Sequence, residues 1–352
     1  MVHQFSTLEN KIKSLCHGIE DRTCTLESLS MHSLVWENYL LNRAKLFGRL
    51  GSSVVTGTAM KAICHRINFP YRFWDDLAYK GRTYKEKESL GSMRDQLANQ
   101  LLSLSSDEVL IRSSFSDEIY GVNSLHYERI NHDFVWNLLA ENEVMADFNL
   151  VGMKCSYDYL SLKFVSKKAN KVDDIGTGFI ITNSMSGLRA LEVKGFVFVL
   201  ACTNGMIIEN GGVGKVVRRI HKGRRLELGG LQDTPDYTRD PKFEEIREKV
   251  YNHISYTRSE TFKEKVLDKI NTAMEKDIKE EEEVERIEGI LKLNEEERKT
   301  YKNFLLPNLD THGKTLWGYV QAATEMAHSP TFESTLRQEE LEYSAWKVLE
   351  TY

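Results

Sequence analysis

The first hundred residues carry apolar side chains at helical spacing. Residues 34–41 place large apolar and aromatic side chains as an apolar-faced helix does, and residues 56–67 repeat the pattern. Thr58 is in position to cap this second helix, which ends before a proline because proline disfavours helix in the residue that precedes it. A third helix is expected over residues 89–104. Residues 1–105 are therefore predicted to form a mainly helical N-terminal part.

The middle of the chain changes to the alternating pattern of strands. Pairs of short β-rich runs, each joined by a polar turn, predict hairpins. The runs are residues 109–112 with 119–122, 150–155 with 159–165, and 178–183 with 188–193. One further strand is expected over residues 195–206, and one short helix over residues 132–143. Residues 106–228 are therefore predicted to be an antiparallel β-rich core with one short helix.

The last third returns to a helical pattern. Residues 229–241 contain two of the five prolines and are predicted to be a linker. Residues 242–352 are expected to form a helical C-terminal part, with one long helix over 243–288 and later helices over 315–328 and 333–349. The long helix is polar nearly all round, which is unusual for a helix that packs only on its own domain, so we expect a homo-oligomer. The predicted fold class is α+β, with a central, mostly antiparallel sheet of hairpins, helices packed on it, and helical parts on both sides.

Composition narrows the class of protein. Hydrophobic residues make up 41% and charged residues 28% of the chain, and the formal net charge of −5 argues against a protein that coats nucleic acid with its whole surface. The five cysteines form no C-x-x-C pair, which indicates reduced thiols. We find neither a signal peptide nor the run of about 18 apolar residues that spans a bilayer. The expected location is the cytoplasm of a bacterial host, with no membrane partner.

The strongest charge signal is the basic segment, residues 215–225, with six basic residues in eleven positions and no acid. They are Lys215, Arg218, Arg219, Lys222, Arg224 and Arg225, with His221 among them. Glycines at positions 214 and 223 let the backbone approach a phosphate, and the planar fork of arginine suits phosphate oxygens. The basic segment is therefore a candidate nucleic-acid-binding site. The alternatives are a solvated hairpin and pairing of these charges with the acidic C-terminal helices.

A second basic stripe contains Lys154 and Lys163 on predicted strands, and three more lysines follow in a loop. Lys154 and Lys163 alternate with apolar neighbours and could share one sheet face with Tyr157 or Tyr159. Aromatic side chains between basic ones suit the stacking of unpaired bases, although aromatic residues in strands more often belong to a core. Lys154 and Lys163 are therefore included among the candidate nucleic-acid contacts, and solvated positions are the alternative for the loop lysines Lys167, Lys168 and Lys171.

Patterns for nucleotide or metal binding are weak. Residues 211–215 resemble a phosphate-binding loop, but Glu209 stands where a glycine is required and Val216 where Ser or Thr is required. The pairs Cys16-His17 and Cys64-His65 are adjacent residues, and neighbouring side chains rarely bind one ion together. The doublets Asp75-Asp76 and Asp173-Asp174 are expected to be solvated, not the carboxylate cluster of a nuclease. We expect no metal and no cofactor.

Cys202 and His221 raise the question of a thiol nucleophile with its base. Cys202 ends an apolar strand, so a buried hydrophobic position is the stronger interpretation. His221 lies between Arg219 and Lys222, and these like charges disfavour its protonation unless an anion binds. It either donates to a phosphate or anchors a hairpin through a buried hydrogen bond. No catalytic residue is predicted.

An ordered series of motifs runs along residues 55–345. It contains Ile67-Asn68-Phe69-Pro70-Tyr71, the strand 109–112, Thr182-Asn183-Ser184 with Gly187, Ala201-Cys202-Thr203-Asn204-Gly205-Met206, Arg218-Arg219-Ile220-His221-Lys222-Gly223, and Thr315-Leu316-Trp317-Gly318 before Ala322-Ala323-Thr324-Glu325. This series resembles a phage- and plasmid-borne family catalogued as domain of unknown function 932. The resemblance implies a mobile-element setting and no established activity. By fold-level analogy the strand-rich core is also similar to the single-strand annealing proteins of phage recombination.

These observations favour a non-enzymatic nucleic-acid-binding protein of a phage or plasmid. We expect it to bind or anneal single-stranded DNA in recombination or replication, with the basic segment following the backbone of the strand. The alternative is a protein-interaction module that engages a host or phage protein through its charged C-terminal helices. A metal-dependent nuclease is the third and weakest interpretation.

Overall fold

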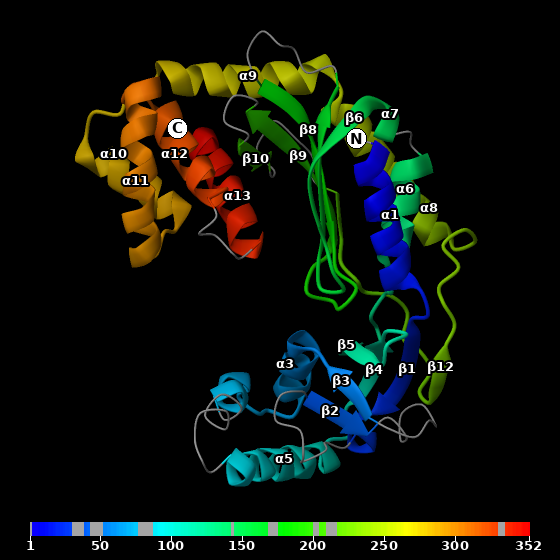
Figure 1. Ribbon diagram of the computed structural model, residues 1–352. Coiled ribbons are helices and arrows are strands. Elements are labelled where there is room, and N and C mark those ends of the chain that lie inside the picture. The colour runs from blue at the N-terminus through cyan, green and yellow to red at the C-terminus, as the bar shows by residue number, and fades with distance from the viewer. Residues whose placement is uncertain are drawn as a thin grey trace.

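The computed structural model describes residues 2–29, 39–42, 52–76, 87–141, 144–167, 175–199, 204–208, 217–329 and 335–352. The strands in these ranges form two sheets, which lie in two bodies joined at a narrow waist (Figure 1). The lower body contains the first sheet, and the upper body contains the second sheet with most of the helices. The prediction of an α+β fold with a hairpin sheet and flanking helices is confirmed.

The lower sheet has the strand order β12-β1-β4-β5-β3-β2. Its neighbouring strands are antiparallel except β3 and β5, which are parallel. Helices α3 and α5 pack on it around a core that includes Ile63, Trp74 and Ile111. The bounds are β1 Glu20–Thr25, β2 Tyr39–Asn42, β3 Ser52–Val55, α3 Gly57–Arg66, α5 Lys87–Ser103, β4 Glu108–Ser113, β5 Glu118–Ser124 and β12 Gly230–Gln232, with a short 3-10 helix η1 over Leu26–Ser28.

The upper sheet has the strand order β10-β9-β8-β7-β6, all antiparallel, and β11 pairs with β9 beside this path. One face carries helices α1, α6 and α8 around an apolar cluster that includes Phe134, Phe179 and Phe243. The bounds are α1 Val2–Cys16, α6 His132–Glu141, α7 Val144–Asp147, β6 Phe148–Cys155, β7 Leu160–Ser166, β8 Ile175–Asn183, β9 Leu191–Val199, β10 Asn204–Ile208, β11 Val217–Arg219 and α8 Pro241–Thr257.

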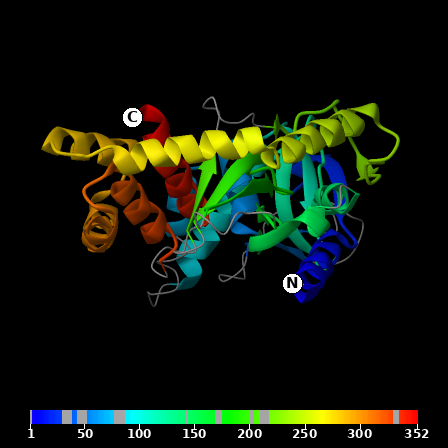
Figure 2. The ribbon, with the colours of Figure 1, turned by 90° about the horizontal axis from the view of Figure 1, so that it is seen from above.

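The other face of the upper sheet is covered by the C-terminal helices. Figure 2 shows α8 and α9 following one another across the top of the molecule, so that α9 carries the chain from one side of the sheet to the other. The later helices then pack around a core that includes Val197, Trp317 and Trp346. Their bounds are α9 Glu260–Glu275, α10 Glu281–Leu291, α11 Glu295–His312, α12 Leu316–Ala327 and α13 Thr335–Thr351. No helix in the described residues is long and apolar enough to cross a membrane.

The three predicted hairpins are confirmed as β4 with β5, β6 with β7, and β8 with β9. They do not share one sheet, because the first hairpin belongs to the lower sheet and the other two to the upper sheet. The strand predicted over residues 195–206 is wrong, since residues 195–199 finish β9 and β10 starts at Asn204. Residues 200–203 between them lie outside the described residues.

The prediction that residues 1–105 are mainly helical is wrong for β1, β2 and β3. In β1 the inward positions are Asp21 and Thr23, so the buried side of this strand is polar and leaves no apolar alternation. Tyr39–Asn42 is a strand paired with β3, and residues 34–38 of the predicted helix lie outside the described residues. Thr56, not Thr58, caps α3: its side chain accepts a hydrogen bond from the amide of Ala59 at 3.2 Å.

The predicted long helix over 243–288 is also wrong, because the chain breaks it into α8, α9 and α10. Ser259 caps the second of these helices by accepting from the amide of Phe262 at 3.2 Å. Each piece buries an apolar side, as Val250 and Phe262 illustrate, so the segment is not polar all round. The predicted linker contains β12, which pairs with β1 and so ties residues 230–232 to the lower sheet.

Candidate nucleic-acid interface

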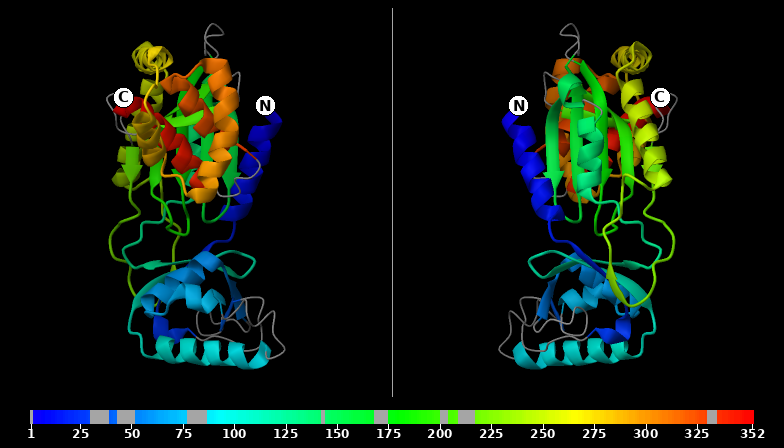
Figure 3. Two further views of the ribbon diagram at one scale, coloured as in Figure 1. Left: turned by 90° about the vertical axis from the view of Figure 1, so that its left-hand side faces the viewer. Right: turned by 90° about the vertical axis from the view of Figure 1, so that its right-hand side faces the viewer.

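The described part of the basic segment, residues 217–225, runs along the waist between the two bodies (Figure 3). Its first residues form β11 on the edge of β9. Lys222 then forms a β-bridge with Tyr127, and the amide of Gly223 donates to the carbonyl oxygen of His126 at 2.7 Å. The backbone is therefore held to β9 of the upper sheet and to the segment between β5 and α6. Lys215 lies outside the described residues.

Side chains of the basic segment alternate between inward and outward positions, as in a strand. Arg219 and His221 point inward, whereas Arg218, Lys222 and Arg224 are exposed. Arg218 keeps 62% of its side chain exposed although it pairs with Glu192 at 2.8 Å. None of the described residues pairs with the side chains of Lys222 and Arg224. The outward positions thus match the interpretation of a solvated hairpin with charges available to a ligand.

The inward cations are held by acids of the sheets and the waist, not by the acidic C-terminal helices. Arg219 binds the carboxylate of Glu128 at 2.8 Å, and this carboxylate is 1% exposed. Arg225, half exposed, pairs with Glu108 at the start of β4. Among the described residues, the pairing predicted with the C-terminal helices does not occur for these arginines.

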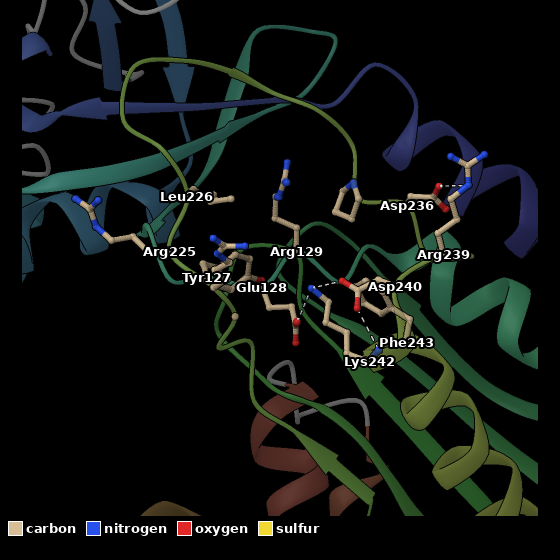
Figure 4. A pocket seen from close by; sticks show the side chains of 13 residues that line it. Tyr127, Glu128, Arg129, Arg225, Leu226, Asp236, Arg239, Asp240, Lys242 and Phe243 are labelled. Atoms are coloured by element: carbon tan, nitrogen blue, oxygen red, sulfur yellow. Dashed lines mark hydrogen bonds and ion pairs between the residues drawn. The ribbon is translucent and has the colours of Figure 1, made fainter.

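A cleft of about 460 Å³ opens beside residues 223–226 (Figure 4). Five basic side chains line it together with three acidic ones. The basic residues are Arg129, Arg224, Arg225, Arg239 and Lys242, and the acidic ones are Glu128, Asp236 and Asp240. Figure 4 shows Arg225 and Arg239 at opposite ends of the cleft. The cleft therefore joins the basic segment to the residues around the start of α8, which contribute Arg239 and Lys242 and which the sequence did not single out.

The cations of the cleft differ in how firmly they are held. Arg129 donates to the carbonyl oxygen of Asp233 at 2.6 Å. Lys242 lies 3.1 Å from Glu128 and 2.8 Å from Asp240; burial lowers its pKa, but these two acids outweigh burial and hold the pKa above its usual value. Arg239 is 88% exposed and makes only a surface pair with Asp236 at 3.4 Å. Arg224, Arg225 and Arg239 are therefore the cations that an anion reaches most easily.

His221 lies in a buried chain of polar side chains. Its Nδ1 is 2.8 Å from the carbonyl oxygen of Glu128, its Nε2 is 3.1 Å from Oδ1 of Asn183, and its ring stacks on Tyr127 at 4.9 Å. Asn183 in turn donates to Nδ1 of His132 at 3.2 Å. Burial lowers the pKa of His221 to about 4. With 9% of its surface exposed, His221 fits the interpretation of a buried anchor better than that of a phosphate donor.

The waist also contains a buried arginine that the sequence did not single out. Arg112 is fully buried, and its guanidinium donates to Asp21 at 2.8 Å, to Asn131 at 2.7 Å and to the carbonyl oxygen of Met185 at 2.7 Å. These partners come from both bodies, so Arg112 joins the two sheets. A charged residue at the end of the apolar run 109–111 was the only local signal of this role.

Lys154 and Lys163 do share one sheet face, but α13 covers it. Lys163 donates to both carboxylate oxygens of Glu342 at 2.5 and 2.7 Å, and Lys154 lies 3.4 Å from Gln338. The two tyrosines predicted beside them already have partners. Tyr157 stacks on Tyr120 at 4.3 Å, and the guanidinium of Arg189 lies 4.8 Å above the ring of Tyr159.

The remaining candidate groups bring no metal or nucleophile together in the described residues. No set of three His, Cys, Asp or Glu side chains there could hold a metal ion. Burial raises the pKa of the Cys16 and Cys64 thiols to about 12, so these cysteines are not activated. Asp75 and Asp76 are exposed, as expected. The phosphate-loop lookalike at 211–215, Asp173, Asp174 and Cys202 lie outside the described residues.

Comparison with known proteins identifies the family of the chain. No curated protein and no solved structure matches it. One family model, described as Domain of unknown function (DUF932), matches residues 157–346. The matched region starts in the loop before β7 and extends into α13, so it spans most of the upper body and the basic segment. Since the match covers more than half of the sequence, the chain belongs to the DUF932 family.

Proposed function

We propose that this protein binds nucleic acid, with single-stranded DNA of a phage or plasmid as its ligand, and performs no chemistry on the strand. The observation that carries the proposal is the convergence of exposed cations at one cleft. Arg224 and Arg225 line the cleft from the basic segment, and Arg239 lines it from the segment before α8. Lys222 is exposed and directly precedes the lining residue Gly223. Phosphate oxygens are the ligand class that clustered arginines suit best.

The existing ion pairs leave these four cations available. Arg225 and Arg239 pair with partly exposed acids, and such surface pairs stabilise a fold by only about 0–1 kcal/mol. A phosphate can therefore replace either acid at small cost. Arg219 and Lys242 are excluded from the count, because both neutralise the buried carboxylate of Glu128.

Salt dependence of binding tests the proposal. Single strands give a slope of roughly −0.7 in log affinity against log salt per phosphate neutralised, so four contacts predict a slope near −2.8. Replacing Arg224 and Arg239 with Ala should flatten the slope by about 1.4 and weaken binding equally for all sequences. The matched control is Lys299→Ala with Lys302→Ala, two exposed lysines of α11, which should leave the slope unchanged.

A wild-type protein without measurable affinity for single- or double-stranded DNA or RNA at about 50 mM salt would refute the proposal. The basic segment would then be reassigned to an acidic partner protein. The alternative function, a module that engages a host or phage protein through its charged C-terminal helices, would be favoured.

We further propose that binding serves recombination or replication of a mobile element in the bacterial cytoplasm. A homo-oligomer stays a prediction without the support of an all-polar helix, because α8, α9 and α10 each bury an apolar side. Light scattering that returns a mass near 40.6 kDa at micromolar concentration would contradict the oligomer.

A further inference from the structure

Two adjoining hollows meet at β6, an edge strand of the upper sheet, and the second of them extends across the sheet face to Phe196 and Phe198 of β9. The first, of about 620 Å³, lies between α1, the loop around Leu188 and the start of α13. The second, of about 470 Å³, lies between β6, Phe198 and α13. Both are lined by Met153 and Lys154, so they form one groove, which we call the β6 groove.

The walls of the β6 groove are apolar and unusually exposed. Met153 is 44% exposed, Leu188 53% and Leu336 43%, although these are large hydrophobic side chains. Tyr159 adds an aromatic ring to the first hollow, with the guanidinium of Arg189 on one face of the ring, and Phe198 adds a ring to the second. Such a surface favours a flat, partly apolar ligand that excludes water from it.

The charges at the rim of the groove favour an anion. Lys11, Lys154 and Arg189 line the first hollow with one acid, Asp158, which is already bonded to Thr58 at 2.8 Å. In the second hollow Glu339 accepts from Ser161 at 2.6 Å and from Arg189 at 2.8 Å. Lys163 is excluded as a ligand contact, because Glu342 occupies its ammonium group. The ligand is thus expected to combine a flat ring with a negative charge.

We propose that the β6 groove holds two successive unpaired nucleotides of a single strand, with bases against Met153 and the rings and phosphates near Lys11 and Lys154. Grooves that bind single strands combine cations with aromatic platforms, because every base has a face that can stack once it is unpaired. A double helix hides these faces. This inference rests on the proposed function and adds to it a source of preference for single strands, separate from the cleft of Figure 4.

Photocrosslinking locates the bases directly. A single-stranded oligonucleotide that contains 5-iodouracil should crosslink to the peptides that carry Met153, Tyr159 or Phe198. Met153→Asp should lower the affinity for single strands about tenfold, since it removes an apolar contact with a base and places a negative charge beside the phosphates, and it should leave the affinity for double strands unchanged. The matched control is Met274→Asp on α9, where the methionine is 43% exposed and the substitution should change neither affinity.

The outcomes separate this inference from the proposed function. If the wild type binds single strands, but crosslinks only to residues of the cleft and tolerates Met153→Asp, the groove is overturned and the proposed function stands. If Met153→Asp weakens single and double strands equally, the groove is again overturned as a source of strand preference. If the wild type binds neither single-stranded nor double-stranded nucleic acid, both proposals fail.

Discussion

Lys163 offers the sharpest test of how the C-terminal helix is attached to the upper sheet. Its ammonium group binds both oxygens of Glu342, whose side chain is 0% exposed, and 11% of the lysine side chain is exposed. Lys163→Met removes this cation and leaves a buried carboxylate whose remaining partner among the described residues is His328, at 2.9 Å. Removing one partner of a buried ion pair costs about 3–5 kcal/mol, because the remaining charge stays desolvated. We therefore expect the free energy of unfolding to fall by about that amount.

Urea unfolding of three variants measures the effect. The double variant Lys163→Met with Glu342→Met should recover most of the loss, because it buries no charge and fills the space with apolar atoms. Lys299→Met on the exposed side of α11 is the control and should change stability by less than about 0.5 kcal/mol.

The pH dependence of stability provides an independent test of this ion pair. Burial raises the pKa of Glu342, but Lys163 and His328 outweigh it and hold the pKa below its usual value. Without Lys163 the effect of burial prevails, so Glu342 takes up a proton more readily in the folded state as the pH falls. The stability gap between wild type and Lys163→Met should therefore narrow toward acid pH. A loss below about 1 kcal/mol, or a double variant no more stable than the single one, would refute this account of α13.

Two further predictions concern buried positions in the sheet and at the waist. Burial lowers the pKa of His132 to about 4. The unfolded chain therefore binds a proton at this residue from about pH 6.5 downward, whereas the folded protein does not. From His132 alone, the free energy of unfolding should fall by about 2 kcal/mol between pH 7 and pH 5. An NMR titration that places the pKa of His132 near its usual value would contradict this prediction. A Cβ on Gly178 would lie 1.9 Å from the carbonyl oxygen of Phe164, so Gly178→Ala should lower the free energy of unfolding by about 3 kcal/mol or more. A Cβ on Gly289 in α10 meets nothing within 4 Å, so Gly289→Ala should raise the free energy of unfolding by about 0.5–1 kcal/mol. Equal melting temperatures for these two glycine variants would contradict the prediction, because they would mean that β8 can move away from β7 to make room for the added Cβ.

The parts of the fold that could be predicted from the sequence depend on local signals. The three hairpins were found because apolar residues alternate in both strands and polar turns join them. Breaks in the C-terminal helices also have local signals that the prediction passed over. Ser259 caps α9, and Asn294 with Glu297 forms a capping box at the start of α11.

The parts that could not be predicted depend on partners far away in the sequence. Residues 20–25 show no strand pattern, because Asp21 is buried only by virtue of Arg112, which lies on β4. Lys163 looked like an exposed cation because its partner Glu342 lies 179 residues later. A charged side chain gives the same local signal in solvent and in a buried pair, so its role depends on the tertiary structure.

The role of the basic segment could be predicted from the sequence only in part. Its strand periodicity, visible in the sequence, already separates Arg219 and His221 from Arg218, Lys222 and Arg224. Only the structure shows which set faces inward, because His221 has to meet Asn183 and Tyr127, and Arg219 has to neutralise Glu128. These two side chains tie the backbone to β8 and to the segment between β5 and α6, so the neighbouring cations project outward at strand spacing. The proposed phosphate ligand suits this arrangement, because a row of cations on a fixed backbone loses little conformational entropy when it meets a regularly spaced polyanion.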